Sequence, residues 1–285
     1  MTSPLNMSAE EHNVYVIDEP VRYFVAGSGP PLFLLHGLGE SAMVWHETIA
    51  PLSERFTVYA PDLLGHGHTG KPRHDYTPAL GVAFVVALMD TLHIQSAHLL
   101  GNSLGGLVAA VTTISHPDRV RSLVLENTAG LGRETAAFLR LMTLPLVGDL
   151  LAMPTRWTLR RLMRILLYDP TAISNQFFEA LYQDRRVPGN KQALLRMLRA
   201  GVDWRGMKPS VRFDDQLAAI SAPTLLVCGR EDPLFPLAHA ERAASLMPNA
   251  QLHVFEQCRH WPHMEHATEF STLVSDFMAA QEIGD

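Results

Sequence analysis

The segment 101–105, with the sequence GNSLG, most constrains what this chain of 285 residues can fold into. It follows an apolar run that ends at Leu100, and Gly106 begins a helical pattern. A serine between small residues at a strand-to-helix junction is typical of a sharp turn that lifts the hydroxyl above a sheet. The helix that begins there favours negative charge at its first turn. We therefore predict that Ser103 is a nucleophile at the end of a buried strand.

Strand-forming runs alternate with helical patterns along most of the chain. Strands are predicted over residues 12–17, 21–25, 32–35, 56–60, 97–100, 122–125, 224–227 and 252–255, and helices over 41–52, 77–92, 104–115, 237–246 and 267–278. This alternation predicts a mostly parallel sheet flanked by helices, with an antiparallel hairpin at its start. Ligand sites of such sheets lie at the C-terminal ends of the strands.

One segment, residues 131–213, breaks the alternation and has only helical patterns, separated by prolines. We predict a helical cap over residues 131–213 and a core made of residues 1–130 and 214–285. The cap has 14 Lys and Arg against 6 Asp and Glu, a net charge of +8, and the remainder has a net charge of −14. Two interpretations stay open: attraction between the two parts, or a field that favours an anionic substrate.

A serine hydroxyl needs a general base, and the base needs a carboxylate that orients it. In folds with this turn, the chain order is serine, acid, histidine. Asp232 follows a predicted strand and is our candidate acid, with Glu231 as its neighbouring alternative. His260 lies between the last predicted strand and the closing helix and is our candidate base. Glu126, at the end of another strand, stays open as the orienting acid.

The tetrahedral intermediate of acyl transfer needs two hydrogen-bond donors. One predicted donor is the amide of Leu104, directly after the serine. The other is the amide of Leu38, in the loop that follows the strand at 32–35. His36 in this loop is predicted to brace the backbone, and Gly37 to let it turn.

Residues 65–70, GHGHTG, match the glycine pattern of dinucleotide-binding proteins, with Asp90 placed 20 residues beyond Gly70. That pattern should open a helix, but residues 71–74 continue as a loop. His66 and His68 have no nearby cluster of carboxylates or cysteines for a metal. We therefore expect neither a nucleotide cofactor nor a metal.

Composition narrows the remaining classes of function. No apolar run approaches the roughly 18 residues that span a bilayer, and residues 1–11 lack the pattern of a secretion signal. Cys228 and Cys258 are therefore expected to be free thiols. The acidic body argues against nucleic acid. We expect a cytoplasmic protein that acts on a small molecule, without a membrane partner, and we leave open a homodimer or higher homo-oligomer.

The motifs together resemble the α/β-hydrolase superfamily over nearly the whole chain. They are HG at 36–37, Asp62 with GHG at 65–67, the segment 101–106, GRED at 229–232 and HW at 260–261. The resemblance implies a mostly parallel eight-stranded sheet, a helical cap inserted after strand 6, and a Ser103-Asp232-His260 triad. Ser103 argues against relatives with an aspartate nucleophile.

Within the superfamily, the chain resembles the carbon–carbon bond hydrolases of meta-cleavage products and related carboxylesterases. Asn102, LYD at 167–169 and LHVF at 252–255 carry this resemblance. It implies that Asn102 and Trp261 line the substrate site, and we assign Gly37 to the same site. Four features differ from the group. LGES at 38–41 replaces a glycine-rich stretch, Glu47 replaces an asparagine, and Arg259 replaces the glycine before the histidine. Leu181 aligns with the group's cap arginine, with Arg185 and Arg186 close by.

We therefore expect a serine hydrolase that cleaves an ester or a carbonyl-activated carbon–carbon bond of an apolar or aromatic molecule, with or without a carboxylate. A carboxylesterase or lactonase without carbon–carbon activity is one alternative, and a cofactor-free perhydrolase or thioesterase is another. The alternative from a different class is a hydrolase-like ligand receptor.

Overall fold

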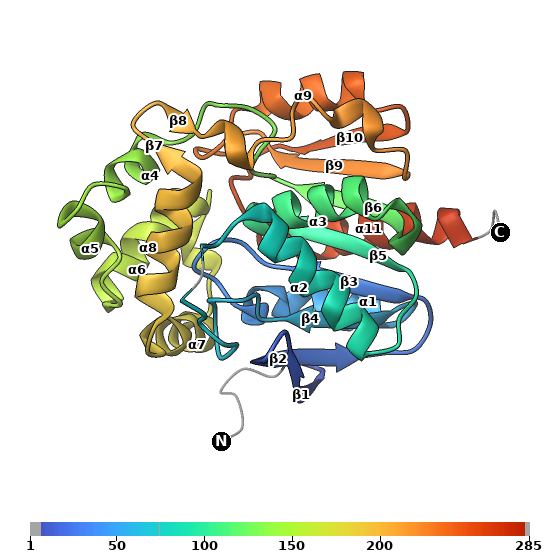
Figure 1. Ribbon diagram of the computed structural model, residues 1–285, viewed down its shortest axis with the longest axis horizontal. Helices are drawn as coiled ribbons and strands as arrows, with labels where there is room; N and C mark the ends of the chain where they lie inside the picture. The colour runs from blue at the N-terminus through green and yellow to red at the C-terminus, as the bar shows by residue number, and fades with distance from the viewer. Residues whose placement is uncertain (1–6, 74, 283–285) are drawn as a thin grey trace.

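The computed structural model describes residues 7–73 and 75–282. Residues 1–6, which belong to the segment 1–11 that lacks the pattern of a secretion signal, lie outside the described residues. A sheet flanked by helices forms one part of the molecule, and a group of helices lies at one side of it (Figure 1).

The main sheet has eight strands in the order β1-β2-β4-β3-β5-β6-β9-β10. β1 pairs with β2 and β2 with β4 in antiparallel fashion, and all other neighbours are parallel. All eight predicted strands are present, and the predicted mostly parallel sheet is confirmed. The strands are β1 (Glu10–Val16), β2 (Glu19–Ala26), β3 (Pro31–Leu35), β4 (Thr57–Pro61), β5 (Ala97–Asn102), β6 (Val120–Glu126), β9 (Thr224–Gly229) and β10 (Ala250–Phe255).

Helices cover both faces of this sheet (Figure 1). α2 (Pro78–Thr91) packs beside α3 (Leu104–Ser115) on one face, and α1 (His46–Ser53) packs beside α11 (Ala267–Glu282) on the other. α9 (Leu237–Leu246) packs on β9 and β10. The central strands are therefore buried on both sides, which explains their nearly continuous apolar sequences. Shorter helical turns are η1 (Ala42–Trp45), η2 (Pro117–Arg119), η4 (Pro209–Val211), η5 (Leu217–Ala219) and α10 (Pro262–Glu265).

The chain between β6 and β9 forms the group of helices at the side of the sheet, which we call the cap (Figure 1). Its elements are α4 (Ala137–Met142), α5 (Val147–Leu151), α6 (Arg156–Leu166), η3 (Pro170–Ala172), α7 (Asn175–Arg186), α8 (Asn190–Gly201), β7 (Val202–Asp203) and β8 (Gly206–Met207). The expectation of helices alone was therefore wrong for the β7–β8 hairpin. The exact division at residues 130 and 214 stays a prediction.

A buried polar cluster joins the cap to the core. The carboxylate of Asp184, on α7, accepts hydrogen bonds from Ser41 Oγ at 2.5 Å and from Arg22 Nη2 at 3.3 Å. Arg22 also donates from Nε to Asp62 Oδ2 at 2.8 Å. Burial alone would lower the pKa of Arg22, but the two carboxylates outweigh it and raise that pKa. We call Arg22, Ser41, Asp62 and Asp184 the clasp.

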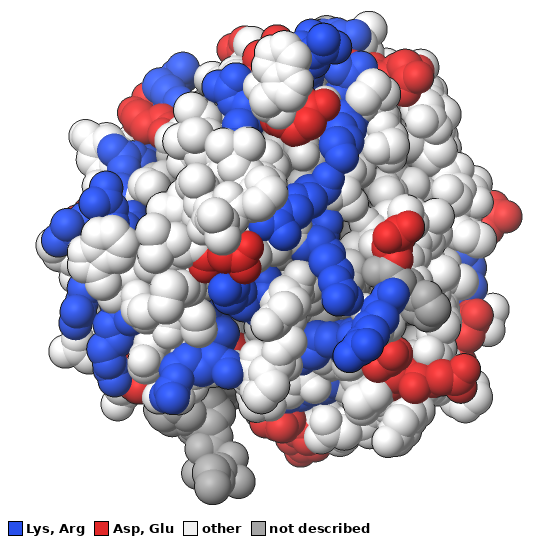
Figure 2. All heavy atoms as spheres, turned by 60° about the vertical axis from the view of Figure 1, so that its left-hand side comes forward, with Lys and Arg blue, Asp and Glu red and all other residues white. Residues whose placement is uncertain are grey.

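Lys and Arg side chains gather over the cap face (Figure 2). Several of them stack on aromatic rings of the cap itself, such as Arg156 over Tyr182 at 4.5 Å. Among the described residues, Arg212 with Asp214, at the boundary, is the one ion pair between a cap cation and a core carboxylate. Direct pairing between the two parts therefore does not account for the charge asymmetry.

Candidate active site

Ser103 lies at the junction of β5 and α3 in a strained backbone conformation, with φ 54° and ψ −113°. The turn is so tight that a β-carbon on Gly101 would lie 2.3 Å from the carbonyl carbon of Gly105. A β-carbon on Gly105 would lie 1.9 Å from the Leu35 carbonyl oxygen. Glycine is therefore required at both positions, and strain of this kind in a non-glycine residue is concentrated at functional sites.

His260 and Asp232 form a buried pair next to this turn. Asp232 comes from the β9–α9 loop and His260 from the connection between β10 and α10. Their Oδ2 and Nδ1 atoms are 3.0 Å apart, and each side chain is 2% exposed. The Leu234 amide holds the other carboxylate oxygen at 2.8 Å. Burial would lower the pKa of His260, but the Asp232 charge and hydrogen bond outweigh it, so this pKa lies above its usual value.

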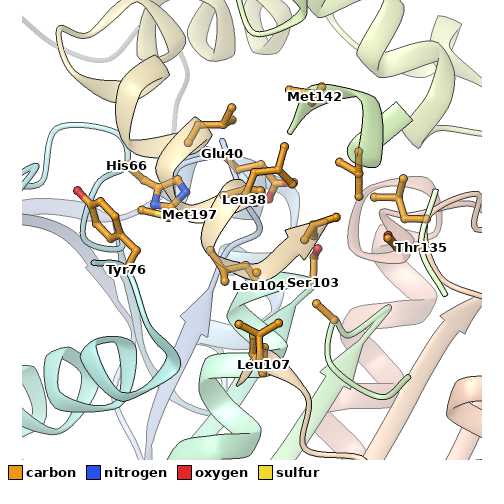
Figure 3. Close-up of a pocket in the computed structure, with 18 of the residues that line it drawn as sticks. Leu38, Glu40, His66, Tyr76, Ser103, Leu104, Leu107, Thr135, Met142 and Met197 are labelled. Carbon is orange, nitrogen blue, oxygen red and sulfur yellow. The ribbon is translucent and has the colours of Figure 1, made fainter. Parts of the chain in front are cut away.

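A cavity of about 530 Å³ lies between core and cap, and both Ser103 and His260 line it (Figure 3). Apolar side chains make up most of the rest of its lining, and many of them come from α2, α3, α4, α6 and α8, with Leu107, Met142 and Met197 among them. An apolar cavity with a few polar groups at one place is the usual form of a small-molecule site.

The two predicted oxyanion donors lie beside the serine. Leu38 and Leu104 both line the cavity, and Figure 3 shows them near Ser103. Neither amide donates a hydrogen bond to any of the described residues, so both are free for a ligand oxygen. His36 holds the Leu38 loop, because its Nδ1 donates to the Gly37 carbonyl at 2.8 Å and its Nε2 accepts from the Leu63 amide at 2.9 Å. Burial lowers the pKa of His36, consistent with a neutral bracing role.

The three predicted substrate-binding residues lie behind the lining of this cavity. Gly37 and Trp261 both donate to Glu40, from the amide at 2.7 Å and from Nε1 at 2.9 Å. Asn102 is fully buried, and its Nδ2 donates to the His260 carbonyl at 3.1 Å. They are not among the residues that line the main cavity, whereas Glu40 is.

Glu126 is engaged with a different histidine. Its carboxylate accepts from the backbone amide of His263 at 2.8 Å and lies 2.8 Å from His263 Nδ1, with both side chains fully buried. In this structure Asp232, and not Glu126, contacts His260.

Two charged residues of the cavity lie where the sequence departs from the family pattern, but the sequence did not assign them to the site. Glu40 comes from the loop after β3, and Arg185 comes from α7 of the cap, one turn beyond Leu181. Glu40 lies within the segment 38–41, and Arg185 lies close to Leu181, so each is at or near a position where the sequence departs from the family pattern. The sequence does not indicate that the two side chains reach the same cavity.

The glycine-rich segment 65–70 forms a closed loop, in which the Gly65 amide donates to the Gly70 carbonyl at 2.8 Å, and no helix follows it directly. His66 lines the cavity, and burial lowers its pKa to about 3, so it is neutral. Cys228 and Cys258 are buried free thiols. Within residues 7–73 and 75–282 we find no cluster of His, Cys, Asp or Glu suited to a metal, and no helix long and apolar enough to cross a membrane.

This sheet, its inserted cap and the serine at a strained strand-to-helix turn define an α/β-fold serine hydrolase. The sequence matches the alpha/beta hydrolase fold family over residues 30–267, and the chain belongs to this family. It is 34% identical over 269 residues to the 2-hydroxymuconate semialdehyde hydrolase of Pseudomonas sp. (strain CF600), covering 89% of this chain and 88% of the relative.

Two solved structures have the same fold. One is the meta-cleavage product hydrolase CumD of Pseudomonas fluorescens IP01, with a TM-score of 0.84, 28% identity, and coverage of 96% of this chain and 99% of that one. The other is a membrane phospholipase A, with a TM-score of 0.83, 25% identity, and coverage of 97% and 87%. The resemblance to meta-cleavage product hydrolases is thus confirmed.

Proposed function

We propose that this protein hydrolyses an ester or a carbonyl-activated carbon–carbon bond of an apolar small molecule through Ser103, His260 and Asp232. One observation carries this proposal: Ser103, at its strained turn, and His260, paired with Asp232, line the same cavity. The relatives with carbon–carbon hydrolase names and the phospholipase support the two bond types.

In the proposed first step, Ser103 Oγ attacks the substrate carbonyl carbon and its proton passes to His260 Nε2. Asp232 holds Nδ1–H and stabilises the imidazolium. The amides of Leu38 and Leu104 bind the oxyanion. The tetrahedral intermediate then collapses, and the leaving group takes the proton from His260.

In the second step, water attacks the acyl-enzyme while His260 accepts one of its protons. Collapse of the second intermediate releases the carboxylic acid and restores Ser103. The mostly apolar lining predicts that the acyl part of the substrate is hydrophobic, because each methylene group that becomes buried stabilises binding by ~0.8 kcal/mol.

Labelling with a fluorophosphonate probe tests the nucleophile. The wild type should be labelled, and Ser103→Ala should not, whereas Ser115→Ala, at the far end of α3, should be labelled like the wild type. Equal labelling of Ser103→Ala would refute the proposal, and so would single turnover on aryl esters, which is the behaviour of a ligand receptor. Rates on an aryl ester, a lactone and a ring-fission dienone acid then distinguish the two bond types.

A further inference from the structure

The Glu40 carboxylate accepts hydrogen bonds from two residues that the sequence predicts to bind the substrate, Gly37 and Trp261. Its Oε2 accepts from the Gly37 amide at 2.7 Å, and its Oε1 accepts from Trp261 Nε1 at 2.9 Å. A carboxylate that accepts two such bonds is firmly held. These two donors are therefore unavailable to a carboxylate carried by a ligand.

The surroundings of Glu40 add further acceptor oxygens. A β-carbon built on Gly37 would lie 2.8 and 2.9 Å from the Glu40 carboxylate oxygens and 3.0 Å from Asn102 Oδ1. The donation from Asn102 Nδ2 to the His260 carbonyl fixes which way this amide faces. Its Oδ1 is buried and has no hydrogen-bond partner among the described residues. Acceptors therefore converge at this end of the site.

Arg185 is, with Arg161, one of two Lys or Arg residues among the described residues that line the cavity and could attract an anionic substrate. Its Nε is buried without a hydrogen-bond partner among the described residues, and burial lowers its pKa. The charge that offsets this effect is that of Glu40. Glu40 thus already supplies a negative charge that partly offsets the effect of burial on Arg185.

We propose that Glu40 determines the substrate class of this site, and that it selects substrates uncharged at this end over those carrying a carboxylate. Glu40 lines the same cavity as Leu38 and Ser103 (Figure 3). A second carboxylate here would meet like charge in an environment with little water to screen it. This inference rests on the proposed function, and it narrows that function to neutral esters, lactones or ketones.

Two esters with the same leaving group and acyl length test the proposal: 4-nitrophenyl pentanoate and 4-nitrophenyl hydrogen glutarate, which differ in a methyl or a carboxylate end. At pH 8 the wild type should show a kcat/KM at least about tenfold higher for the pentanoate. Glu40→Gln keeps an acceptor oxygen for Trp261 but removes the charge. It should lower this ratio at least fivefold, mainly through a smaller KM for the glutarate.

The matched control is Glu47→Gln, because Glu47 is 58% exposed on α1 and does not line the cavity. Its ratio should equal that of the wild type. If the wild type has the higher kcat/KM for the glutarate ester, the inference is wrong. This outcome is measured on the wild type alone, so it does not depend on whether Glu40→Gln folds. An unchanged ratio in folded Glu40→Gln also overturns the inference. In either of these outcomes the proposed function would still hold, provided that Ser103→Ala is not labelled by the fluorophosphonate and that the wild type turns over one of the two esters.

Discussion

At the residue scale, the two buried acids near the site have different partners. Asp232 lies 3.0 Å from His260, and Glu126 lies 2.8 Å from His263. If Asp232 orients the base, Asp232→Asn should lower kcat by about 10³- to 10⁴-fold, because the imidazole loses its orientation and the stabilisation of its charged form. Glu126→Gln should keep kcat within about tenfold. Steady-state rates on an aryl ester, with melting temperatures to confirm folding, would decide which acid serves His260.

The pKa of His260 gives the site a characteristic pH dependence. Only neutral His260 can accept the serine proton, and its pKa lies above the usual value of about 6.5. Activity should therefore be lost as the pH falls through this raised pKa, with an acid limb of kcat/KM above 6.5 for a neutral ester. Because the Glu40 charge also raises this pKa, Glu40→Gln should move the limb to lower pH. A limb at or below 6.5 in the wild type would contradict the raised pKa of His260.

Ser103, Asp232 and His260 could be predicted from the sequence because each follows a strand whose apolar run is evident. The role of Glu40 could not. Its contact with Trp261 joins residues 221 positions apart, and no local pattern specifies which way a loop carboxylate turns. The positions of Asn102 and Trp261 were likewise only partly predictable. The sequence indicates that both lie close to the site, but not whether their side chains line the cavity or lie behind its lining.

At the element scale, the clasp fixes α7 of the cap to the core. Asp184→Ala should leave the Ser41 hydroxyl proton and the terminal nitrogen of Arg22 without their buried acceptor, and should lower the free energy of unfolding by about 1–3 kcal/mol. Urea denaturation should show a lower midpoint with an unchanged slope. Asp149→Ala is the matched control, since Asp149 forms its ion pairs at the cap surface and should change the midpoint little. Equal midpoints for both variants would show that the clasp contributes nothing to stability.

The elements that the sequence did not indicate are the short ones. α5 has five residues, and β7 and β8 have two each, so none is long enough to show a hydrophobic period. Gly206, with φ 121°, starts β8, and a β-carbon there would lie 2.2 Å from the Arg133 carbonyl oxygen. This oxygen accepts a hydrogen bond from the amide of the next residue, Met207, at 2.8 Å. Such pieces depend on tertiary contacts, whereas β3 and β5 are specified by apolar runs that only a doubly covered strand can bury.

At the scale of the whole molecule, the cavity exists because core and cap meet over Ser103. Met197 of α8 lines it from the cap side (Figure 3). With about 530 Å³ of mostly apolar space, kcat/KM of the wild type should rise up to about fourfold per methylene group along a series of 4-nitrophenyl esters, which corresponds to ~0.8 kcal/mol each. Met197→Trp should fill part of this space and lower kcat/KM on the octanoate about tenfold while changing the acetate less than about twofold.

The same substitution at the cap surface separates a filled cavity from a disturbed cap. Met153 is 42% exposed and does not line the cavity, so Met153→Trp should keep the full chain-length dependence. If Met197→Trp lowered the rates on acetate and octanoate equally, the substitution would be acting on the position of Ser103 and His260. Loss on the octanoate alone would establish that the acyl chain lies between α8 and the core, the two parts of the chain that only the folded molecule brings together.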